Sequence, residues 1–358
     1  MAVHQVLVAA SRHDAVTNAA LELRSLLRRA GPSEIFSLYY DAELAAEVVP
    51  LAEFPRRAGP SGSDVLVFHS AIGEPYVQAF LMERPERVVL VYHNISPAPL
   101  FRPYAPQFAD VLERGRQELR ELAPRVELAL APSQYNADEL EEIGFRDVRV
   151  APLVVDVDRL AGSAPDADTT FHLTRNVEGP LVLFVGQLLP HKRPDLLVQA
   201  FNVLLTYLEP DAHLVLAGAG TLPLYRRAVW LLAHELNLPT VWFAGRVSDA
   251  ELVSFYRRAD LFVTASEHEG FCVPLLEAMS FDLPVIARAH AAIPETLGGA
   301  GLVLPPDDDP VLLAEAMAAV MGDEALHSGL VASGRRRLAE FSPDAARATF
   351  LRHLLEVV

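Results

Sequence analysis

The chain of 358 residues is 51% hydrophobic and 22% charged, and its formal net charge at pH 7 is −17. Its length exceeds the roughly 250 to 300 residues that one hydrophobic core can serve, which predicts two domains, and its apolar content excludes intrinsic disorder. The acidic balance disfavours nucleic acid as a partner. No apolar run reaches the roughly 18 to 20 residues that cross a bilayer, and the first residues lack the layout of a secretory signal; we therefore expect a cytoplasmic protein without a transmembrane segment.

Apolar segments of strand length recur along the whole chain. Most are solidly apolar rather than alternating, as expected for parallel strands that are covered on both faces. In the first half these segments are 5–11, 35–40, 65–70, 88–94, 128–133 and 148–155, and in the second half 181–187, 213–220, 241–245, 261–266, 284–289 and 301–305.

Stretches with helical periodicity separate these segments. Asp14 can cap a helix that carries Ala20, Leu23 and Leu27 on one face and ends at Gly31, and Pro194 opens another helix. Because strand and helix alternate in both halves of the chain, the sequence predicts an α/β fold with two Rossmann-like, doubly wound parallel-sheet domains.

The domain boundary is expected in the stretch 156–180, which is rich in turn-forming residues and has neither period. This predicts a first domain at 1–157 and a second at 158–341. Ser342 and Pro343 start one more helix, 342–358, which we expect to pack back onto the first domain.

Two cations, Lys192 and Arg193, precede the helix that begins at Pro194 and follow a strand that ends at Gly186. Positive charges at a helix N-terminus oppose the helix dipole, so an anion bound between them and the helix would explain their position. A solvated surface pair is the alternative.

The segment SEHEGFCVPLLEAM, 266–279, joins a strand to a helix and carries Glu269 and Glu277. Gly270 permits close approach to the backbone, and Pro274 opens the helix. Two carboxylates that flank backbone amides suit a nucleotide sugar, because the diphosphate accepts hydrogen bonds and the hydroxyls donate them. For Glu277 the alternative is simple stabilisation by the helix dipole. The single cysteine, Cys272, is expected to be a packing residue and not a nucleophile.

The spacing of the two glutamates in EGFCVPLLEAM resembles the Glu-x7-Glu signature of the retaining glycosyltransferases of family four, which have the GT-B fold. The similarity extends to VGQLLPHKRPDLLVQAF, FAGRVSDAELVSFYRRADLFVTAS and LPVIARAHAAIPETLGGAGLVLPPDD and, less specifically, to VYHNISP and LALAPSQYNADELEEIGF in the first half. It implies two Rossmann-like domains facing each other across a cleft, of which the first binds the acceptor and the second the nucleotide sugar.

The resemblance also implies roles for individual residues. His93, Lys192 and Glu269 would be the catalytic residues: His93 faces the donor sugar from the first domain, Lys192 neutralises the diphosphate, and Glu269 binds sugar hydroxyls. Glu277 would hold the ribose. The other implied donor-binding positions are Gly186, Gln187, Arg193, Arg246, Val247, Gly270, Phe271, Cys272, Val273 and Leu275.

The sequence departs from the family pattern in two places. Many members have arginine where this chain has Gln187, so one charge on the leaving diphosphate is missing unless Arg193 supplies it. The Gly-rich loop that many members have after the first strand reads SRHDAVTN here, which makes Arg12, His13 and Asp14 candidate acceptor-binding residues. For Asp14, helix capping is the alternative.

The activity implied by the resemblance is retaining, metal-independent transfer of a hexose from a nucleotide-diphosphate sugar, with GDP-mannose or a UDP-hexose favoured. The acceptor would be a hydroxyl of a glycan, a lipid-linked glycan or a small molecule, and no cofactor is expected. Both glutamates would bind substrate, unlike the paired carboxylates of glycosidases. Two hypotheses stay open: a weakly active or inactive subunit that binds a nucleotide sugar or a partner glycosyltransferase, and an epimerase or phosphorylase on the same architecture. Peripheral contact with the inner face of the membrane and the oligomeric state also stay open.

Overall fold

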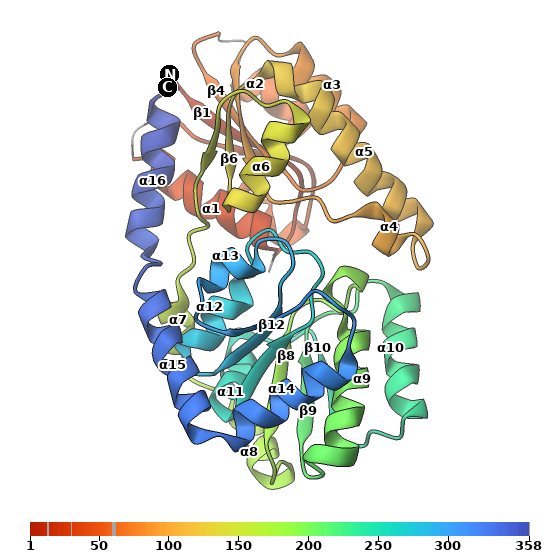
Figure 1. The fold of residues 1–358 in the computed structure, drawn as a ribbon. Helices are drawn as coiled ribbons and strands as arrows, with labels where there is room; N and C mark the ends of the chain where they lie inside the picture. Colours follow the sequence, from red (N-terminus) through yellow and green to blue (C-terminus); the bar gives the residue numbers. More distant parts are fainter. Residues whose placement is uncertain (13, 30, 59–61, 358) are drawn as a thin grey trace. The chain divides into compact units, whose positions relative to one another are not determined.

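The structure is a computed structural model that describes residues 1–12, 14–29, 31–58 and 62–357. Its contacts divide the chain into two compact units (Figure 1). Unit 1 comprises Met1–Pro99, Pro106–Val154 and Asp344–Val358, and unit 2 comprises Leu100–Ala105 and Val155–Pro343. No helix among the described residues is both long enough and apolar enough to span a membrane.

Unit 1 is built on a parallel sheet of seven strands in the order β3-β2-β1-β4-β5-β6-β7. The strands are β1 (Val3–Ala10), β2 (Ile35–Tyr40), β3 (Val48–Pro50), β4 (Val65–Ser70), β5 (Arg87–Tyr92), β6 (Val126–Ala131) and β7 (Val148–Val150). The helices in this part of the chain are α1 (Ala15–Leu27), α2 (Phe54–Arg57), α3 (Pro75–Glu83), α4 (Ala98–Phe101), α5 (Pro106–Leu122), α6 (Gln134–Ile143) and α16 (Pro343–Leu355), with short 3-10 turns at Ala42–Leu44, Leu51–Glu53 and Ala123–Arg125.

Unit 2 is built on a parallel sheet of six strands in the order β10-β9-β8-β11-β12-β13. The strands are β8 (Leu181–Val185), β9 (His213–Ala217), β10 (Val241–Gly245), β11 (Leu261–Thr264), β12 (Val285–Arg288) and β13 (Leu302–Leu304). The helices are α7 (Val157–Ala161), α8 (Ala167–Asn176), α9 (Pro194–Val203), α10 (Pro223–Glu235), α11 (Asp249–Arg258), α12 (Val273–Ser280), α13 (Ile293–Leu297), α14 (Pro310–Gly322) and α15 (Glu324–Leu338), with a 3-10 turn at Pro190–Lys192 and a π-helical turn at Leu204–Leu208.

Both sheets have the doubly wound strand order of Rossmann-like domains. In unit 1 the chain reverses direction across the sheet between β1 and β4, and in unit 2 between β8 and β11. Ligands of such sheets bind at the carboxyl ends of the strands beside this switch point. The predicted fold class, two doubly wound parallel-sheet domains, is therefore confirmed.

The expected helix starts are found at Asp14 and Pro194. The Asp14 carboxylate accepts a hydrogen bond from the Thr17 backbone N–H at 2.9 Å, so it caps α1, and Pro194 is the first residue of α9. The first helix ends at Leu27, however, before the predicted Gly31.

The stretch 156–180, where we expected the domain boundary, is in part helical. Asp156 caps α7 and Asp166 caps α8, since each carboxylate accepts a backbone N–H three residues further along. Leu173 of α8 is buried. These short helices have too few apolar positions to show a period, so only their caps reveal them.

The C-terminal helix α16 packs on unit 1. Leu354 is buried in a cluster with Leu23, Leu27, Val65 and Val67. The Arg347 guanidinium donates to the Glu22 carboxylate at 2.7 Å. Apolar and polar contacts therefore tie this helix to the rest of unit 1.

Candidate functional site

The candidate site in unit 2 lies at the carboxyl ends of β8 to β11. Gly186 follows β8 with φ of 155°, and Gly218 follows β9 with φ of 153°. A Cβ atom on Gly218 would lie 1.9 Å from the Gly186 carbonyl oxygen. Only glycine allows these two loops to approach so closely beside the switch point between β8 and β11.

Lys192 and Glu269 meet at this switch point. The Lys192 ammonium donates to Glu269 Oε1 at 2.6 Å, and the Ser266 hydroxyl donates to the same oxygen at 2.8 Å. Their side chains are only 17% and 11% exposed. Burial acts to lower the pKa of Lys192, but the nearby Glu269 carboxylate outweighs it and the pKa is raised. Lys192 is thus a buried cation at neutral pH, paired with the carboxylate expected to bind sugar.

Glu277 lies in the first turns of α12 and is held by Tyr256 of α11. The Tyr256 hydroxyl donates to Glu277 Oε2 at 2.9 Å. Burial raises the pKa of Glu277, and the hydrogen bond from Tyr256 opposes that rise. The Tyr256 ring stacks on Phe281 with centroids 4.9 Å apart, so the hydroxyl itself is held in place. This arrangement engages one carboxylate oxygen and orients the other.

The turn between the two glutamates begins α12. Cys272 precedes the helix in the left-handed conformation, with φ of 68°, and no side chain caps this end. The Leu275 N–H already donates to the Cys272 carbonyl at 3.1 Å, and the Phe271 carbonyl accepts from the Thr296 hydroxyl at 2.6 Å. Burial raises the pKa of the Cys272 thiol well above its ordinary value, so the thiol is neutral, as expected of a packing residue.

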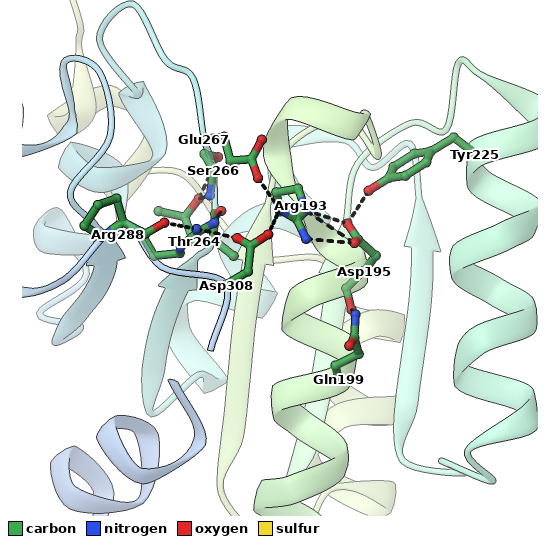
Figure 2. Close-up of polar contacts among 11 residues, drawn as sticks. Arg193, Asp195, Gln199, Tyr225, Thr264, Ser266, Glu267, Arg288 and Asp308 are labelled. Atoms are coloured by element: carbon green, nitrogen blue, oxygen red, sulfur yellow. Dashed lines mark hydrogen bonds and ion pairs between the residues drawn. The ribbon is translucent and has the colours of Figure 1, made fainter. Parts of the chain in front are cut away.

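Arg193, the other cation before α9, is surrounded by carboxylates (Figure 2). Its guanidinium contacts Glu267, Asp308 and Asp195, and its Nη1 lies 2.7 Å from Asp308 Oδ2. Asp308 also binds the buried Arg288. This network ties the loop after β8 to the loop after β11 and to the segment before α14. The charge of Arg193 is balanced without a bound anion.

A pocket of about 650 Å³ adjoins these loops, between the ends of β8 to β10 and helix α10. Leu188, Phe243 and Trp230 form apolar parts of its wall. Its charged lining consists of Arg226, Arg227 and Arg246. In the described part of the chain these arginines have no carboxylate partner, although the protein carries a net charge of −17. The pocket therefore suits a ligand that is both flat and anionic.

The loop after β10 contributes the implied base-binding residues. Gly245 has φ of 70°, and its carbonyl accepts the Gly218 N–H at 2.8 Å. Arg246 is exposed in the pocket wall, and Val247 precedes the capping box that starts α11. Gln187, the departure from the family pattern, is exposed, and its Oε1 accepts from the Thr221 hydroxyl at 3.2 Å.

In unit 1, His93 follows β5 at the carboxyl edge of the sheet. Its Nε2 lies 2.8 Å from Nδ1 of His69, whose Nε2 lies 2.8 Å from Gln5 Oε1. Burial lowers the pKa of His93 to about 4 and that of His69 well below the ordinary value. Both rings are therefore neutral at pH 7.

The candidate acceptor residues have structural contacts. Arg12 pairs with Glu43 at 3.2 Å on the surface, and Asp14 accepts from both the backbone and the hydroxyl of Thr17. Helix capping thus accounts for the position of Asp14, and no role in binding a sugar acceptor is needed to explain it. His13 lies outside the described residues.

Sequence reasoning missed several partners of the expected residues. Ser266 and Tyr256, which bind the two glutamates, and Gln5 and His69, which lie behind His93, were not singled out. The arginines and tryptophan of α10 were also missed. The sequence RRAVW, with two cations and an indole one helical turn apart after a Gly-Ala-Gly loop, was the available signal for the pocket.

The chain is similar in sequence to proteins named as glycosyltransferases. Residues 167–337 match the family model of glycosyl transferases group 1. The D-inositol 3-phosphate glycosyltransferase of Xylanimonas cellulosilytica is 30% identical over 233 residues, which is 62% of this chain and 55% of that protein. A GDP-mannose-dependent alpha-mannosyltransferase of Mycolicibacterium smegmatis is 33% identical over 189 residues, 52% of this chain and 44% of that protein. The chain thus spans about half the length of these relatives.

Solved structures share the fold over nearly the whole chain. Anabaena HepE in complex with UDP-glucose superposes with a TM-score of 0.76 at 16% identity, covering 99% of both chains. Sucrose-phosphate synthase from Thermosynechococcus elongatus superposes with a TM-score of 0.75 at 18% identity, covering 100% of both. The predicted resemblance to glycosyltransferases with the GT-B fold is confirmed, since residues 167–337 match the model of glycosyl transferases group 1 and the relatives are named as glycosyltransferases.

Proposed function

We propose that the protein is a retaining hexosyltransferase that moves a hexose from a nucleotide-diphosphate sugar to a hydroxyl group, without a metal ion or other cofactor. The observation that carries this proposal is the pairing of Lys192 with Glu269 beside a pocket lined by unpaired arginines. A diphosphate needs the cation and a sugar needs the carboxylate. The site holds both, each neutralising the other.

Binding of the donor would exchange these partners. The diphosphate would take the Lys192 ammonium, and the freed Glu269 carboxylate would accept hydrogen bonds from sugar hydroxyls. Both groups are shielded from water, so their interactions with substrate are stronger than at the surface. The buried pair thus keeps two charged groups in place for the donor.

Retaining transfer on one face of the sugar passes through an oxocarbenium-like transition state, and the protein's main task is to stabilise the departing diphosphate. Lys192 and the uncapped N-terminus of α12 supply positive charge for that purpose. Glu277, held by Tyr256, would bind the ribose hydroxyls, and Arg246 and Val247 would contact the base.

The pocket supports a keto base in the donor. Arginine and tryptophan side chains only donate hydrogen bonds, and guanine, through O6 and N7, and uracil, through its two carbonyls, both offer acceptors to such donors. GDP-mannose or a UDP-hexose is therefore the proposed donor class. Three of the relatives are named as GDP-mannose-dependent mannosyltransferases.

The proposed acceptor is a hydroxyl of a glycan, a lipid-linked glycan or a small molecule. Relatives are named for an inositol phosphate acceptor and for O-antigen chains, so the shared chemistry is a hydroxyl and not one compound. Because nucleotide sugars are cytoplasmic metabolites, we place the reaction in the cytoplasm, either in solution or at the inner face of the membrane.

Ligand-dependent thermal unfolding without added metal tests the proposal. Wild type and Glu277→Ala are heated with UDP, GDP, dTDP or ADP and with their hexose conjugates. A ligand at a hundred times its Kd adds about 2.7 kcal/mol of stability. We expect a rise in Tm with the guanine or uracil series that is lost in the variant. No rise with any nucleotide at millimolar concentration would overturn donor binding.

A catalytically weak subunit is the second candidate, and one observation favours it. Arg193 is held by three carboxylates, and Gln187 is neutral. Of these three residues, therefore, only Lys192 has a positive charge that is paired with a single carboxylate, which a diphosphate could replace. This candidate predicts nucleotide binding without release of nucleoside diphosphate from the donor, in the presence of any acceptor.

A further inference from the structure

Three polar side chains cross the sheet of unit 1 as a hydrogen-bonded row that ends at His93. In the strand register, Gln5 of β1 lies beside Val67 of β4, two residues before His69, and His69 lies beside Val91 of β5, two residues before His93. Because side chains alternate faces along a strand, Gln5, His69 and His93 share one face. The row runs along the switch point of this sheet, where ligands of doubly wound folds bind.

The direction of every hydrogen bond in the row follows from one backbone carbonyl. The Ala20 carbonyl only accepts, and a side-chain nitrogen of Gln5 donates to it at 3.0 Å. Gln5 Oε1 therefore faces His69 and accepts from its Nε2 at 2.8 Å. With its proton on Nε2, neutral His69 presents a lone pair on Nδ1, which accepts from His93 Nε2 at 2.8 Å.

Burial keeps the row neutral. Gln5 is fully buried and His69 is 2% exposed. A second proton on His69 would place a cation in this interior, and no carboxylate hydrogen-bonds to His69 among the described residues. A fully apolar site would not define which nitrogen of His93 carries the proton, whereas this row does.

We propose that Gln5 and His69 are positioning residues that hold His93 as its neutral Nε2–H tautomer, so that Nδ1 is a hydrogen-bond acceptor for a substrate hydroxyl. That the hydroxyl belongs to the donor sugar rests on the proposed function; the tautomer does not. No partner for Nδ1 is found among the described residues, and the ring is half-buried. His93 then neither donates to a phosphate nor acts as a general acid.

The tautomer can be measured on the wild-type protein without any substrate. In a ¹⁵N-histidine-labelled sample at pH 7, long-range ¹H–¹⁵N correlation distinguishes a protonated ring nitrogen from an unprotonated one. His93→Gln identifies the His93 signals by their disappearance. We expect an unprotonated Nδ1 and a protonated Nε2. A proton on Nδ1, or on both nitrogens, would overturn the proposal.

Two variants of nearly equal size test whether His69 sets this tautomer. His69→Leu removes the acceptor, and His93 should then populate both tautomers. His69→Asn places an amide oxygen where Nδ1 lies, and should restore the wild-type signals. Ser37→Ala, a buried polar substitution on β2 outside the row, controls for loss of stability. Unchanged His93 signals in His69→Leu would contradict the positioning role.

Kinetics separate positioning from general destabilisation. With the substrate identified, His69→Leu should lower kcat/KM for the donor about tenfold, the size expected for one misdirected hydrogen bond. His69→Asn should recover most of this loss. Affinity for the nucleoside diphosphate, which lacks the sugar, should not change in either variant. A protein that binds no nucleotide would refute the proposed function and leave the tautomer result standing.

Discussion

The Lys192 ammonium lies 2.6 Å from Glu269 Oε1. The cation expected to bind the diphosphate therefore forms an ion pair with the carboxylate expected to bind the sugar. Ser266 donates to the same carboxylate oxygen and keeps it aligned with the ammonium. The pair joins the loops after β8 and β11, on the two sides of the switch point. The pair therefore holds the Lys192 ammonium and the Glu269 carboxylate at the place where we expect the donor to bind.

Substitution of Glu269→Gln separates the two roles of this pair. Without its carboxylate partner, Lys192 is free for phosphate, so affinity for the nucleoside diphosphate should stay the same or increase. Turnover of the complete donor should fall by about a hundredfold, since the sugar loses a charged hydrogen-bond acceptor. Calorimetric titration with the diphosphate and steady-state transfer rates measure both. Parallel loss of diphosphate affinity would show that Glu269 contacts the phosphates or holds Lys192 in place.

The strand segments of both domains could be predicted because parallel strands covered on two faces are continuously apolar. Val65–Ser70 is a clear case, with every residue buried. Some short elements escaped this signal. Helices α7 and α8 reveal themselves only by their caps, and β3 is three residues long. The pattern of apolar residues is sufficient to predict the strands of both sheets. Helices in the polar segments between them can be predicted only from residues that cap a helix.

The glutamate pair could be found from sequence because both residues lie in one short segment. Tyr256 and His69 could not be found in this way, because they lie outside the segments that carry the site residues they contact: Tyr256 lies 21 residues before Glu277, and His69 lies 24 residues before His93. Only the strand register brings Gln5 and His69 onto the face of His93. Of the carboxylates around Arg193, Asp195 is two residues away, but Glu267 and Asp308 lie 74 and 115 residues further along and could not be identified from the sequence.

Replacement of Tyr256→Phe tests whether Glu277 acts as an ionised acceptor. Burial raises the pKa of Glu277 and the Tyr256 hydroxyl opposes this, so loss of the hydroxyl should raise the pKa further. Since the ionised carboxylate exists only above its pKa, activity that is lost as pH falls should be lost at a higher pH in the variant. The KM for the donor at neutral pH should rise about tenfold. If the acid limb of the pH–rate profile does not move, Tyr256 does not control the ionisation of Glu277.

The network around Arg193 predicts a loss of stability and not of nucleotide binding. Arg193→Ala leaves three carboxylates close together and partly buried, which should lower the free energy of unfolding by about 2 to 3 kcal/mol. Arg335→Ala, which removes an arginine with a 65% exposed side chain from its pair with Asp282, is the matched control and should leave Tm nearly unchanged. Urea unfolding and titration with the nucleoside diphosphate report the two effects. A larger change in nucleotide affinity than in stability would return Arg193 to the binding site.

The pocket beside α10 predicts a contribution of Arg226 and Trp230 to nucleotide affinity. Both side chains are exposed, so Arg226→Gln and Trp230→Ala should leave the Tm of the unliganded protein almost unchanged. Each should weaken nucleoside diphosphate binding about five- to tenfold through lost hydrogen bonding or stacking. Tyr207→Ala, at a 78% exposed side chain outside the pocket lining, is the control. Equal affinities in all three variants would place the nucleotide elsewhere.

Substitution of Gln187→Arg decides between a transferase and a subunit that only binds. Gln187 is exposed beside the pocket loops, where its amide contacts only the Thr221 hydroxyl among the described residues, so an arginine can be accommodated. If loss of charge on the departing diphosphate limits turnover, the added guanidinium should raise kcat about tenfold. Donor affinity should improve as well. Gln187→Lys, which adds the charge without the planar guanidinium, should give part of the gain in kcat.

Release of nucleoside diphosphate from the donor, with and without acceptor, measures the effect of both substitutions. Unchanged turnover in an active enzyme would show that Lys192 and the α12 N-terminus already suffice, and absent turnover in every variant despite nucleotide binding would establish the subunit hypothesis.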